Sequence, residues 1–141
     1  MNDPNCIFCR IATAQIPAAR VFENERAVAI LDISPLAEGH LLLIPKQHVP
    51  DIRGISPADL GELTGVLPRL VTAVMNATGA TGANVLQNTG ASSGQAVFHL
   101  HFHIIPRVES DALGYRWNAG TYAAGRAEAI KEAVIQNLSA P

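Results

Sequence analysis

The sequence predicts an α+β fold, with an antiparallel sheet of about five strands, one long helix and two shorter helices. Two observations carry this prediction. Short apolar segments at residues 20–23, 27–31 and 40–45 follow one another at hairpin-like spacing, which is typical of neighbouring antiparallel strands. A longer segment with apolar residues at helical spacing comes later, at 56–76, and a last helix is expected over 123–138. Helices added to such a run of strands are typical of α+β proteins.

The N-terminal part is predicted to contain one short helix and three strands. Residues 6–14 have helical composition, and one or two turns of helix are expected there. The strands over 20–23 and 27–31 are separated by the polar residues 24–26, which suit a tight hairpin turn. The third strand, 40–45, is a nearly continuous apolar run, which indicates burial on both faces.

A long helix is predicted over residues 56–76. Ser56 suits the N-cap, Pro57 the first helical position and Asp59 the first turn. Leucine and valine residues recur at helical spacing along the segment. Pro68 lies inside it. Because proline has no backbone N–H, a kink or a shift in hydrogen bonding is expected there.

Two further strands and a last helix complete the prediction. The strands are expected over 83–88 and 97–107, with a loop of small residues at 89–95 between them, and the helix over 123–138. The sequence contains no internal repeat and no low-complexity region. Residues 1–141 are therefore expected to form one domain.

Composition and charge limit the class of protein. The hydrophobic fraction of 48% and the mixed charges fit a soluble globular protein. The net charge of −2, without a basic stripe, argues against a nucleic-acid or membrane partner. No apolar run approaches the ~20 residues that span a bilayer, and the first residues lack the features of a signal peptide. The protein is expected to be cytoplasmic.

The most informative segment is 97–107, which carries His99, His101 and His103 at alternate positions. On a strand these three side chains share one face, and apolar residues fill the other. Imidazole can act near neutral pH as a metal ligand, a proton donor or acceptor, or a nucleophile. The pattern therefore indicates either a metal site or a nucleophilic histidine with helpers. Three surface histidines without a role are the remaining alternative.

The loop before this segment bears on that choice. Small residues from Gly90 to Gly94 allow backbone N–H groups to turn toward an anion, as phosphate sites require. Gln95 adds a side-chain amide four residues before His99. Most such loops are simple turns, but placed directly before a row of histidines this loop favours a phosphoryl substrate.

The two cysteines, Cys6 and Cys9, form a C-x-x-C pair with no predicted strand before it, which argues against a thioredoxin-like redox motif. Two histidines would complete a closed tetrahedral zinc site, and His40, His48 and one end of the triad are candidates. Since His48 follows the third strand, near the expected start of the histidine strand, His48 and His99 are the natural pair. Such a site would be structural. The alternative is a pair of buried reduced cysteines.

The residues also carry a family resemblance. The pattern His-x-His-x-His with two following apolar residues, preceded by Gly94-Gln95-Ala96-Val97, resembles the histidine-triad (HIT) family. In the expected order stand Cys6-Ile7-Phe8-Cys9, Ile16-Pro17-Ala18, Leu31-Asp32-Ile33-Ser34-Pro35, Gly39-His40-Leu41-Leu42-Leu43-Ile44-Pro45-Lys46 and Asn88. The likeness covers nearly the whole chain. It is closest to the branch of small nucleotide-binding hydrolases, in its bacterial-type form with zinc.

The resemblance implies roles for individual residues. His101 matches the nucleophile that attacks the α-phosphorus of a nucleotide and forms a nucleotidyl-imidazole intermediate. His103 matches a histidine that contacts the phosphate, and His40 a supporting histidine. For nucleotide binding it implies Asp32 at the ribose hydroxyls, Ile33, Ile7 and Phe8 near the base, and Asn88, Gly94, Gln95 and Ala96 at the phosphate. In bacterial-type members the zinc ligands fall at Cys6, Cys9, His48 and His99.

The implied activity is hydrolysis or transfer at the α-phosphate of a purine nucleoside phosphoramidate or another nucleotidyl conjugate. The alternatives are a dinucleoside polyphosphate hydrolase or nucleotidyl transferase, and a nucleotide-binding regulatory protein of low activity. Ala96 departs from the family pattern, because some members carry there a serine or threonine hydroxyl that assists the leaving group. The resemblance also implies a homodimer in which the two sheets join and the long helices pack together.

Overall fold

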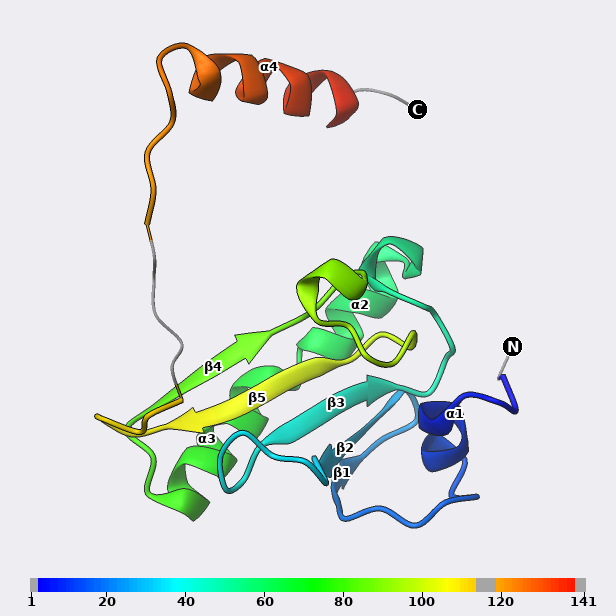
Figure 1. Ribbon diagram of the computed structural model, residues 1–141. Coiled ribbons are helices and arrows are strands. Elements are labelled where there is room, and N and C mark those ends of the chain that lie inside the picture. The colour runs from blue at the N-terminus through cyan, green and yellow to red at the C-terminus, as the bar shows by residue number, and fades with distance from the viewer. Residues whose placement is uncertain (1–2, 114–118, 139–141) are drawn as a thin grey trace.

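The computed structural model describes residues 3–113 and 119–138. A five-stranded antiparallel sheet with the strand order β1-β2-β3-β5-β4 forms its centre (Figure 1). The strands are β1 (Arg20–Glu23), β2 (Ala27–Leu31), β3 (Leu41–Pro45), β4 (Gly82–Leu86) and β5 (Phe102–Arg107). The predicted α+β class with its five-stranded antiparallel sheet is thereby confirmed.

Helices lie on both faces of this sheet. The α-helices are α1 (Ile7–Ala12), α2 (Pro57–Thr64), α3 (Leu67–Thr78) and α4 (Arg126–Leu138), and two short 3₁₀ helices are η1 (Ile52–Gly54) and η2 (Ala91–Ser93). Successive strand residues point to opposite faces. Accordingly Leu63, Leu70 and Val74 of α2 and α3 share one core with Ala29 and Leu43. Phe8 and Ile11 of α1 share a second core with Val28, Ile30 and Leu42.

The predicted long helix is divided into α2 and α3. Its start agrees with the prediction, because the hydroxyl oxygen of Ser56 accepts a hydrogen bond from the backbone N–H of Asp59 at 3.1 Å. Gly65 ends α2, and Pro68 occupies the second position of α3. A proline is tolerated there because the first turn needs no N–H partner. The kink expected at Pro68 is therefore a complete break, placed just before the proline.

The fifth strand begins later than predicted. β5 starts at Phe102, so only His103 lies within it, while His99 and His101 precede it. The prediction of three histidines on one strand is wrong in this respect. The reason is that β4 ends at Leu86, opposite His103, and β3 pairs with β5 no further than Phe102. Before that point the chain has no neighbouring strand with which to continue the ladder.

The predicted alternation of side chains is nevertheless retained through this irregular segment. Leu100 and Phe102 are buried in the core shared with α2 and α3. The rings of His99 and His101 instead lie against the ring of Phe8, at centroid distances of 6.0 and 5.0 Å. A hydrogen bond from the N–H of Leu100 to the carbonyl oxygen of Val49 (2.7 Å), in the segment after β3, holds the backbone here.

The remaining boundaries differ from the predicted ones by a few residues. β4 covers 82–86 instead of 83–88, and α4 begins at Arg126 instead of Ala123. The polar residues 24–26 do form the hairpin turn, since Oδ1 of Asn24 accepts from the N–H groups of Arg26 (2.9 Å) and Ala27 (2.7 Å). Among the described residues, no helix combines the length and the apolar character that crossing a membrane requires.

Candidate active site and metal site

His99 presents one ring nitrogen to the protein and the other to a metal-ligand cluster. Its Nε2 lies 2.9 Å from the carbonyl oxygen of Pro45. Because a carbonyl oxygen can only accept, Nε2 must carry the proton and donate. Nδ1 of the neutral ring is then an unprotonated lone pair, the form in which imidazole binds a metal. The ring is completely buried.

His101 has the opposite orientation. Its Nδ1 lies 2.7 Å from the backbone carbonyl oxygen of His99, so Nδ1 carries the proton and donates. Nε2 is left as the unprotonated nitrogen. An unprotonated imidazole nitrogen is a nucleophile, and no proton has to be removed from it before attack. The carbonyl of one histidine thus fixes the tautomer of the next.

The tautomer of His103 is determined by two consecutive hydrogen bonds, the first of which comes from a backbone amide. The N–H of Leu36 donates to Nδ1 of His40 at 3.1 Å, so the proton of the neutral His40 ring lies on Nε2. This Nε2 lies 2.9 Å from Nδ1 of His103 and donates to it. The proton of the neutral His103 ring is therefore on Nε2. In contrast to His101, His103 offers an N–H donor.

Burial keeps these rings neutral. Desolvation is the largest cause that lowers the pKa of His103 to about 4, and the nearby His101 and His40 rings lower it further. Desolvation likewise lowers the pKa values of His101 and His40, although Asp32 acts in the opposite direction on both. Nε2 of His40 lies 3.8 Å from the Asp32 carboxylate, and because burial outweighs that attraction, this contact is not an ion pair.

The loop before the histidines is braced by Gln95, which is 4% exposed. Its Oε1 accepts from the N–H of Gly90 (2.8 Å), and its Nε2 donates to the carbonyl oxygens of Pro50 (2.7 Å) and Val97 (3.1 Å). Both amide hydrogens are therefore used inside the protein. Gln95 shapes the predicted phosphate loop, and its side-chain N–H groups are not directed to a ligand.

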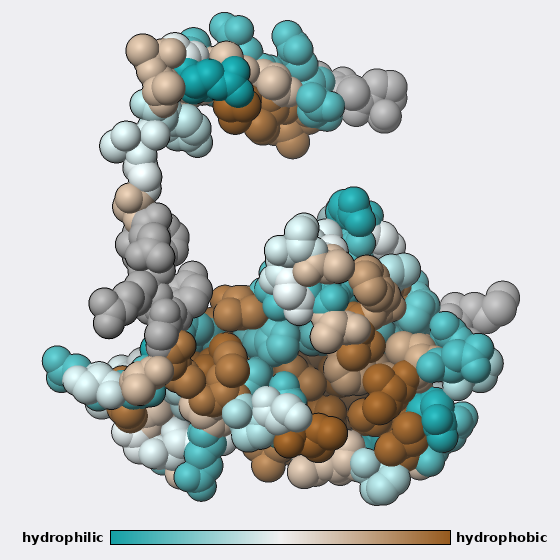
Figure 2. Space-filling model, in the orientation of Figure 1, coloured by the Kyte–Doolittle hydropathy of each residue, from teal (hydrophilic) through white to brown (hydrophobic). Residues whose placement is uncertain are grey.

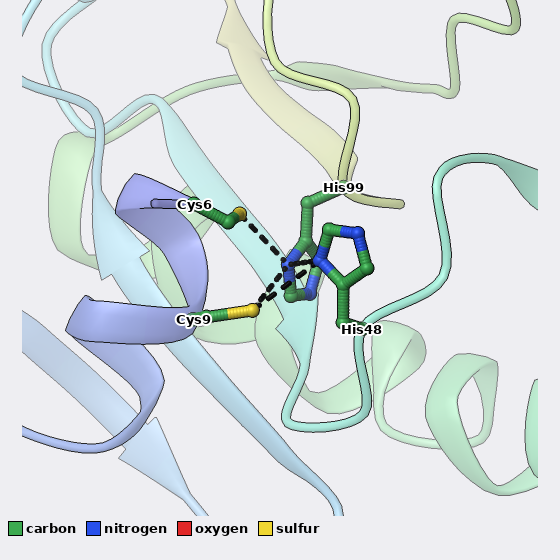
Figure 3. A group of neighbouring side chains, drawn as sticks. All are labelled: Cys6, Cys9, His48 and His99. Atoms are coloured by element: carbon green, nitrogen blue, oxygen red, sulfur yellow. Dashed lines mark hydrogen bonds between the residues drawn. The ribbon is translucent and has the colours of Figure 1, made fainter. Parts of the chain in front are cut away.

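Four predicted metal ligands are brought together at one point. Figure 3 shows Cys6 and Cys9, from the start of α1, facing the rings of His48 and His99. Nδ1 of His99 lies 3.4 Å from Sγ of Cys6, 3.5 Å from Sγ of Cys9 and 3.2 Å from Nδ1 of His48. The Cys9–His48 distance, from Sγ to Nδ1, is 3.3 Å.

This geometry fits a tetrahedral ion. With zinc bonds of about 2.3 Å to sulfur and 2.0–2.1 Å to nitrogen, tetrahedral ligand atoms lie roughly 3.3–3.8 Å apart. The bond from the second nitrogen of His99 to Pro45 is the outer contact that orients a metal-bound imidazole. Burial raises the pKa of the Cys9 thiol, and a bound cation would offset that cost by favouring the thiolate. These residues can hold a metal.

A second group, Asp32, His40 and His103, also has ligand atoms close together. The hydrogen bonds argue against a metal there, because Nε2 of His40 carries the proton that it donates to His103. Asp32 uses Oδ1 to accept from the N–H of Ser34 at 2.8 Å, and its Oδ2 faces His40. Asp32 thus caps the turn after β2, and its second oxygen lies at the histidine site.

The other predicted nucleotide-binding residues occupy different environments. Ile7 and Ile33 are 46% and 94% exposed, and Ala96 is also exposed. Asn88 is half-buried, with its side-chain amide beside Gly94, whose positive φ of 93° suits glycine. Phe8, in contrast, is 7% exposed and lies under the histidine rings.

No residue pattern predicted the three backbone groups that determine where the protons lie on the histidine rings. The amide of Leu36, the carbonyl of Pro45 and the carbonyl of His99 determine which nitrogen of each ring carries a proton. Backbone groups are present at every residue, so no residue type marks them. The pattern of alternate histidines indicated that rings would gather, and only the fold reveals their tautomers.

Comparison with known proteins places this arrangement in a family. The chain matches the HIT domain over residues 13–110. The chain belongs to the HIT family. The predicted resemblance is thereby confirmed, and the matched region contains His40 and all three residues of the histidine row.

Two related proteins illustrate the match in sequence. Adenosine 5'-monophosphoramidase hnt1 of Schizosaccharomyces pombe is 37% identical over 135 residues, covering 95% of this chain and 98% of the relative. Adenylylsulfatase HINT3 of Arabidopsis thaliana is 39% identical over 109 residues. That alignment covers 77% of this chain and 55% of the plant protein, so the chain spans about half the length of that relative.

Two solved structures illustrate the match in fold. A HIT family protein from Bacillus subtilis superposes with a TM-score of 0.89 at 34% identity, covering 97% of this chain and 99% of that one. A zinc-bound histidine triad protein from Mycobacterium smegmatis superposes with a TM-score of 0.75 at 33% identity, covering 96% and 98%. A metal-bound relative therefore shares this fold.

Proposed function

We propose that the protein is a nucleotide hydrolase that acts at the α-phosphate of a purine nucleoside phosphoramidate or another nucleotidyl conjugate. The observation that carries the proposal is the pair of opposite tautomers. His101 offers an unprotonated Nε2 and His103 offers an Nε2–H, on rings whose centroids are 4.9 Å apart. A nucleophile beside a hydrogen-bond donor is the arrangement needed for attack on a phosphoryl group.

The reaction would proceed in two displacements. Nε2 of His101 donates its lone pair to the α-phosphorus as the bond from phosphorus to the leaving group breaks, and the leaving group departs with those electrons, an amine taking up a proton from the solvent as it leaves. His103 donates a hydrogen bond to a phosphoryl oxygen while negative charge grows there. Water then attacks the phosphorus, the P–N bond to His101 breaks, one proton is released, and the nucleoside monophosphate leaves. The hydrogen bond from Nδ1 of His101 to His99 stabilises the positive charge on the ring between the two steps.

Two lines of support favour a nucleotide conjugate. The relatives named adenosine 5'-monophosphoramidase and adenylylsulfatase are named for bonds between an adenylyl group and an amine or a sulfate. On this chain, exposed Ile7 and Ile33 are the proposed base contacts, and Asp32 is the proposed ribose ligand. Asn88, with the loop braced by Gln95, is the proposed phosphate contact.

The metal proposed for the four-ligand cluster is zinc. Two thiols and two imidazoles at tetrahedral spacing suit zinc better than the oxygen-preferring cations. All four coordination positions would be filled by Cys6, Cys9, His48 and His99, so none would be left for water or substrate. When bound, zinc would supply a structural link between the start of α1, the segment after β3 and the histidine segment.

A homodimer is part of the proposal. β4 is an edge strand of the sheet, and an edge strand is open to pairing with another chain. Figure 1 draws α4 apart from the sheet, and Figure 2 shows apolar atoms along its lower side. Ile130, Val134 and Leu138, four residues apart, are 42%, 52% and 79% exposed. A second copy of the chain would cover this stripe. Sedimentation of the wild type should show a dimer and that of Val134→Asp a monomer. A monomeric wild type would contradict the proposal.

The decisive experiment compares three proteins with adenosine phosphoramidate as substrate. We expect His101→Ala to lose turnover by a factor of at least ~10³, and its quenched reaction to contain no nucleotide attached to the protein. His103→Gln should still become labelled on His101, but more slowly. Wild type should show a covalent adenylyl group on His101 by mass spectrometry. Undiminished turnover by His101→Ala would overturn the mechanism, and faster cleavage of a diadenosine polyphosphate would reassign the substrate.

A further inference from the structure

We propose that Phe8 is a positioning residue for the nucleophile: its ring fixes the plane of the His101 imidazole, and α1 with its cysteines holds Phe8 in place. This inference rests on the proposed role of His101. It assigns to Phe8 a task different from the base contact that the family resemblance implies, and it links the metal cluster to the reacting atom.

The geometry places Phe8 between the two sites. Its ring meets His101 edge to face, at 5.0 Å between centroids and 76° between planes, and meets His99 at 6.0 Å and 77°. With 7% of its surface exposed, Phe8 has little area left for a bound base. Aromatic pairs in this arrangement contribute directional contact beyond the burial of apolar area.

His101 needs such a second contact. One hydrogen bond, from Nδ1 to the carbonyl oxygen of His99, anchors a single ring atom. Rotation about the bonds to the ring would still move Nε2, the atom that must point at phosphorus. The ring of His103, at 4.9 Å between centroids, limits this rotation on one side, and the contact with Phe8 restricts it from the side of α1. Because displacement of a reacting atom by about 1 Å costs up to ~10²-fold in rate, the plane of the ring matters for turnover.

α1 in turn depends on the cluster. The helix has six residues, and no side chain caps its N-terminus. Helices of this length are unstable by themselves. Cys6 and Cys9 lie two residues before and one residue after Phe8, and both face His99 (Figure 3). A metal held by these residues would fix the position from which Phe8 contacts His101.

The test uses Phe8→Leu and Phe8→Ala with Ile11→Ala as the matched control. Ile11 is also 7% exposed, lies on the same helix and packs into the same core. As an aliphatic side chain, it cannot form an aromatic pair with His101. We expect Phe8→Ala to lower kcat by roughly 10- to 100-fold with KM within about twofold, and Phe8→Leu to be intermediate. Ile11→Ala should lose similar thermal stability but retain kcat.

A second readout does not require catalysis. In ¹⁵N-labelled protein at one fixed pH, the Nδ1–H signal of His101 should be sharp in wild type and in Ile11→Ala. It should broaden or shift in Phe8→Leu, and also in wild type after metal removal by a chelator. If wild type cleaves no nucleotide conjugate, the proposed reaction fails while this signal still tests the positioning. Unchanged His101 signals and kcat in Phe8→Leu would overturn the inference.

Discussion

Nε2 of His40 donates a hydrogen bond to Nδ1 of His103 across 2.9 Å, and this bond determines which nitrogen of His103 bears the outward proton. His40 is 2% exposed and receives the amide of Leu36 on its other nitrogen. A buried histidine thus controls the donor that the proposed phosphate would meet. The tautomer of His40 is in turn determined by the backbone amide of Leu36, in the loop between β2 and β3.

The first prediction concerns this relay. His40→Ala should lower kcat by roughly 10- to 100-fold, because His103 is then free to place its proton on Nδ1 and loses its donor function. His40→Gln should recover most of the rate, since its side-chain amide can donate to Nδ1 of His103. Steady-state rates of both variants with one substrate measure this. Equal activity of the Ala and Gln variants would contradict the relay.

The second prediction concerns acid stability. The pKa of His103 is lowered to about 4 in the folded protein, against about 6.5 for an unperturbed histidine. Below pH 6.5 the His103 ring binds a proton in the unfolded chain, whereas in the folded protein it stays neutral until the pH approaches 4. As far as this group is concerned, the free energy of unfolding therefore keeps its full value above pH 6.5. It decreases as the pH falls toward 4, by at most about 1.4 kcal/mol per pH unit. Urea titrations should show a shallower pH dependence for His103→Gln than for wild type, and parallel profiles would refute the assignment.

The third prediction concerns the metal. Cys9→Ser should remove one zinc per chain and lower the Tm by roughly 10 °C or more, because a metal that binds only the folded form stabilises that form. Arg10→Ala is the control, since the neighbouring Arg10 side chain is exposed on the same helix. Metal analysis and calorimetry test both variants. A chelator should destabilise wild type and Arg10→Ala but leave Cys9→Ser unaffected.

The fourth prediction concerns Gly39, which precedes His40. Its φ is +88°, and a Cβ there would lie 2.6 Å from a methyl carbon of Thr78. Gly79 has a φ of +70° but nothing within 4 Å of such a Cβ. Gly79→Ala should cost about 1 kcal/mol from backbone strain alone, and Gly39→Ala about 2–4 kcal/mol because the clash is added. Urea unfolding measures the loss of stability in both variants. Similar losses would mean that the end of α3 shifts at little cost to relieve the clash with Thr78.

The fifth prediction concerns Ala96, which is exposed next to the braced loop. Ala96→Ser introduces the hydroxyl that the resemblance implies at this position in some family members. It should raise kcat for a substrate with an amine leaving group, which needs a proton, by roughly tenfold. For a sulfate leaving group, which departs without one, the rate should change little. Equal acceleration of both substrates would show that the hydroxyl acts on binding rather than on proton delivery.

Much of the fold was predictable because local patterns and tertiary contacts agree. The polar residues 24–26 form their hairpin turn, and the apolar run of β3 is buried throughout, since each follows from its own composition. The break before Pro68 was expected only as a kink. Gly65 has low helix propensity, and together with the proline it ends α2 completely. The late start of β5 depends on where its neighbours end, which its own sequence does not record.

The sequence predicted which residues gather at the candidate site better than it predicted what each side chain contacts. Cys6, Cys9, His48 and His99 were expected at one point and lie there. Phe8 and Gln95 were expected to face a nucleotide, yet Phe8 packs under imidazoles and Gln95 bonds to three backbone groups. Motif spacing identifies which residues gather. Whether a side chain faces solvent or its own chain depends on packing that the motif does not encode.

The four-ligand cluster also bears on the order in which the chain assembles during synthesis. Cys9 and His99 are 90 residues apart, and His48 lies 51 residues before His99. α1 leaves the ribosome before its partners Leu42, Ile44 and the histidine segment are made. Contacts between residues so far apart in the sequence form slowly, because the entropy cost of closing a long loop comes before the contacts contribute any stabilising free energy. α1 is therefore made before the elements that it packs against but reaches its place only after them, and the surroundings of the proposed nucleophile are completed only then.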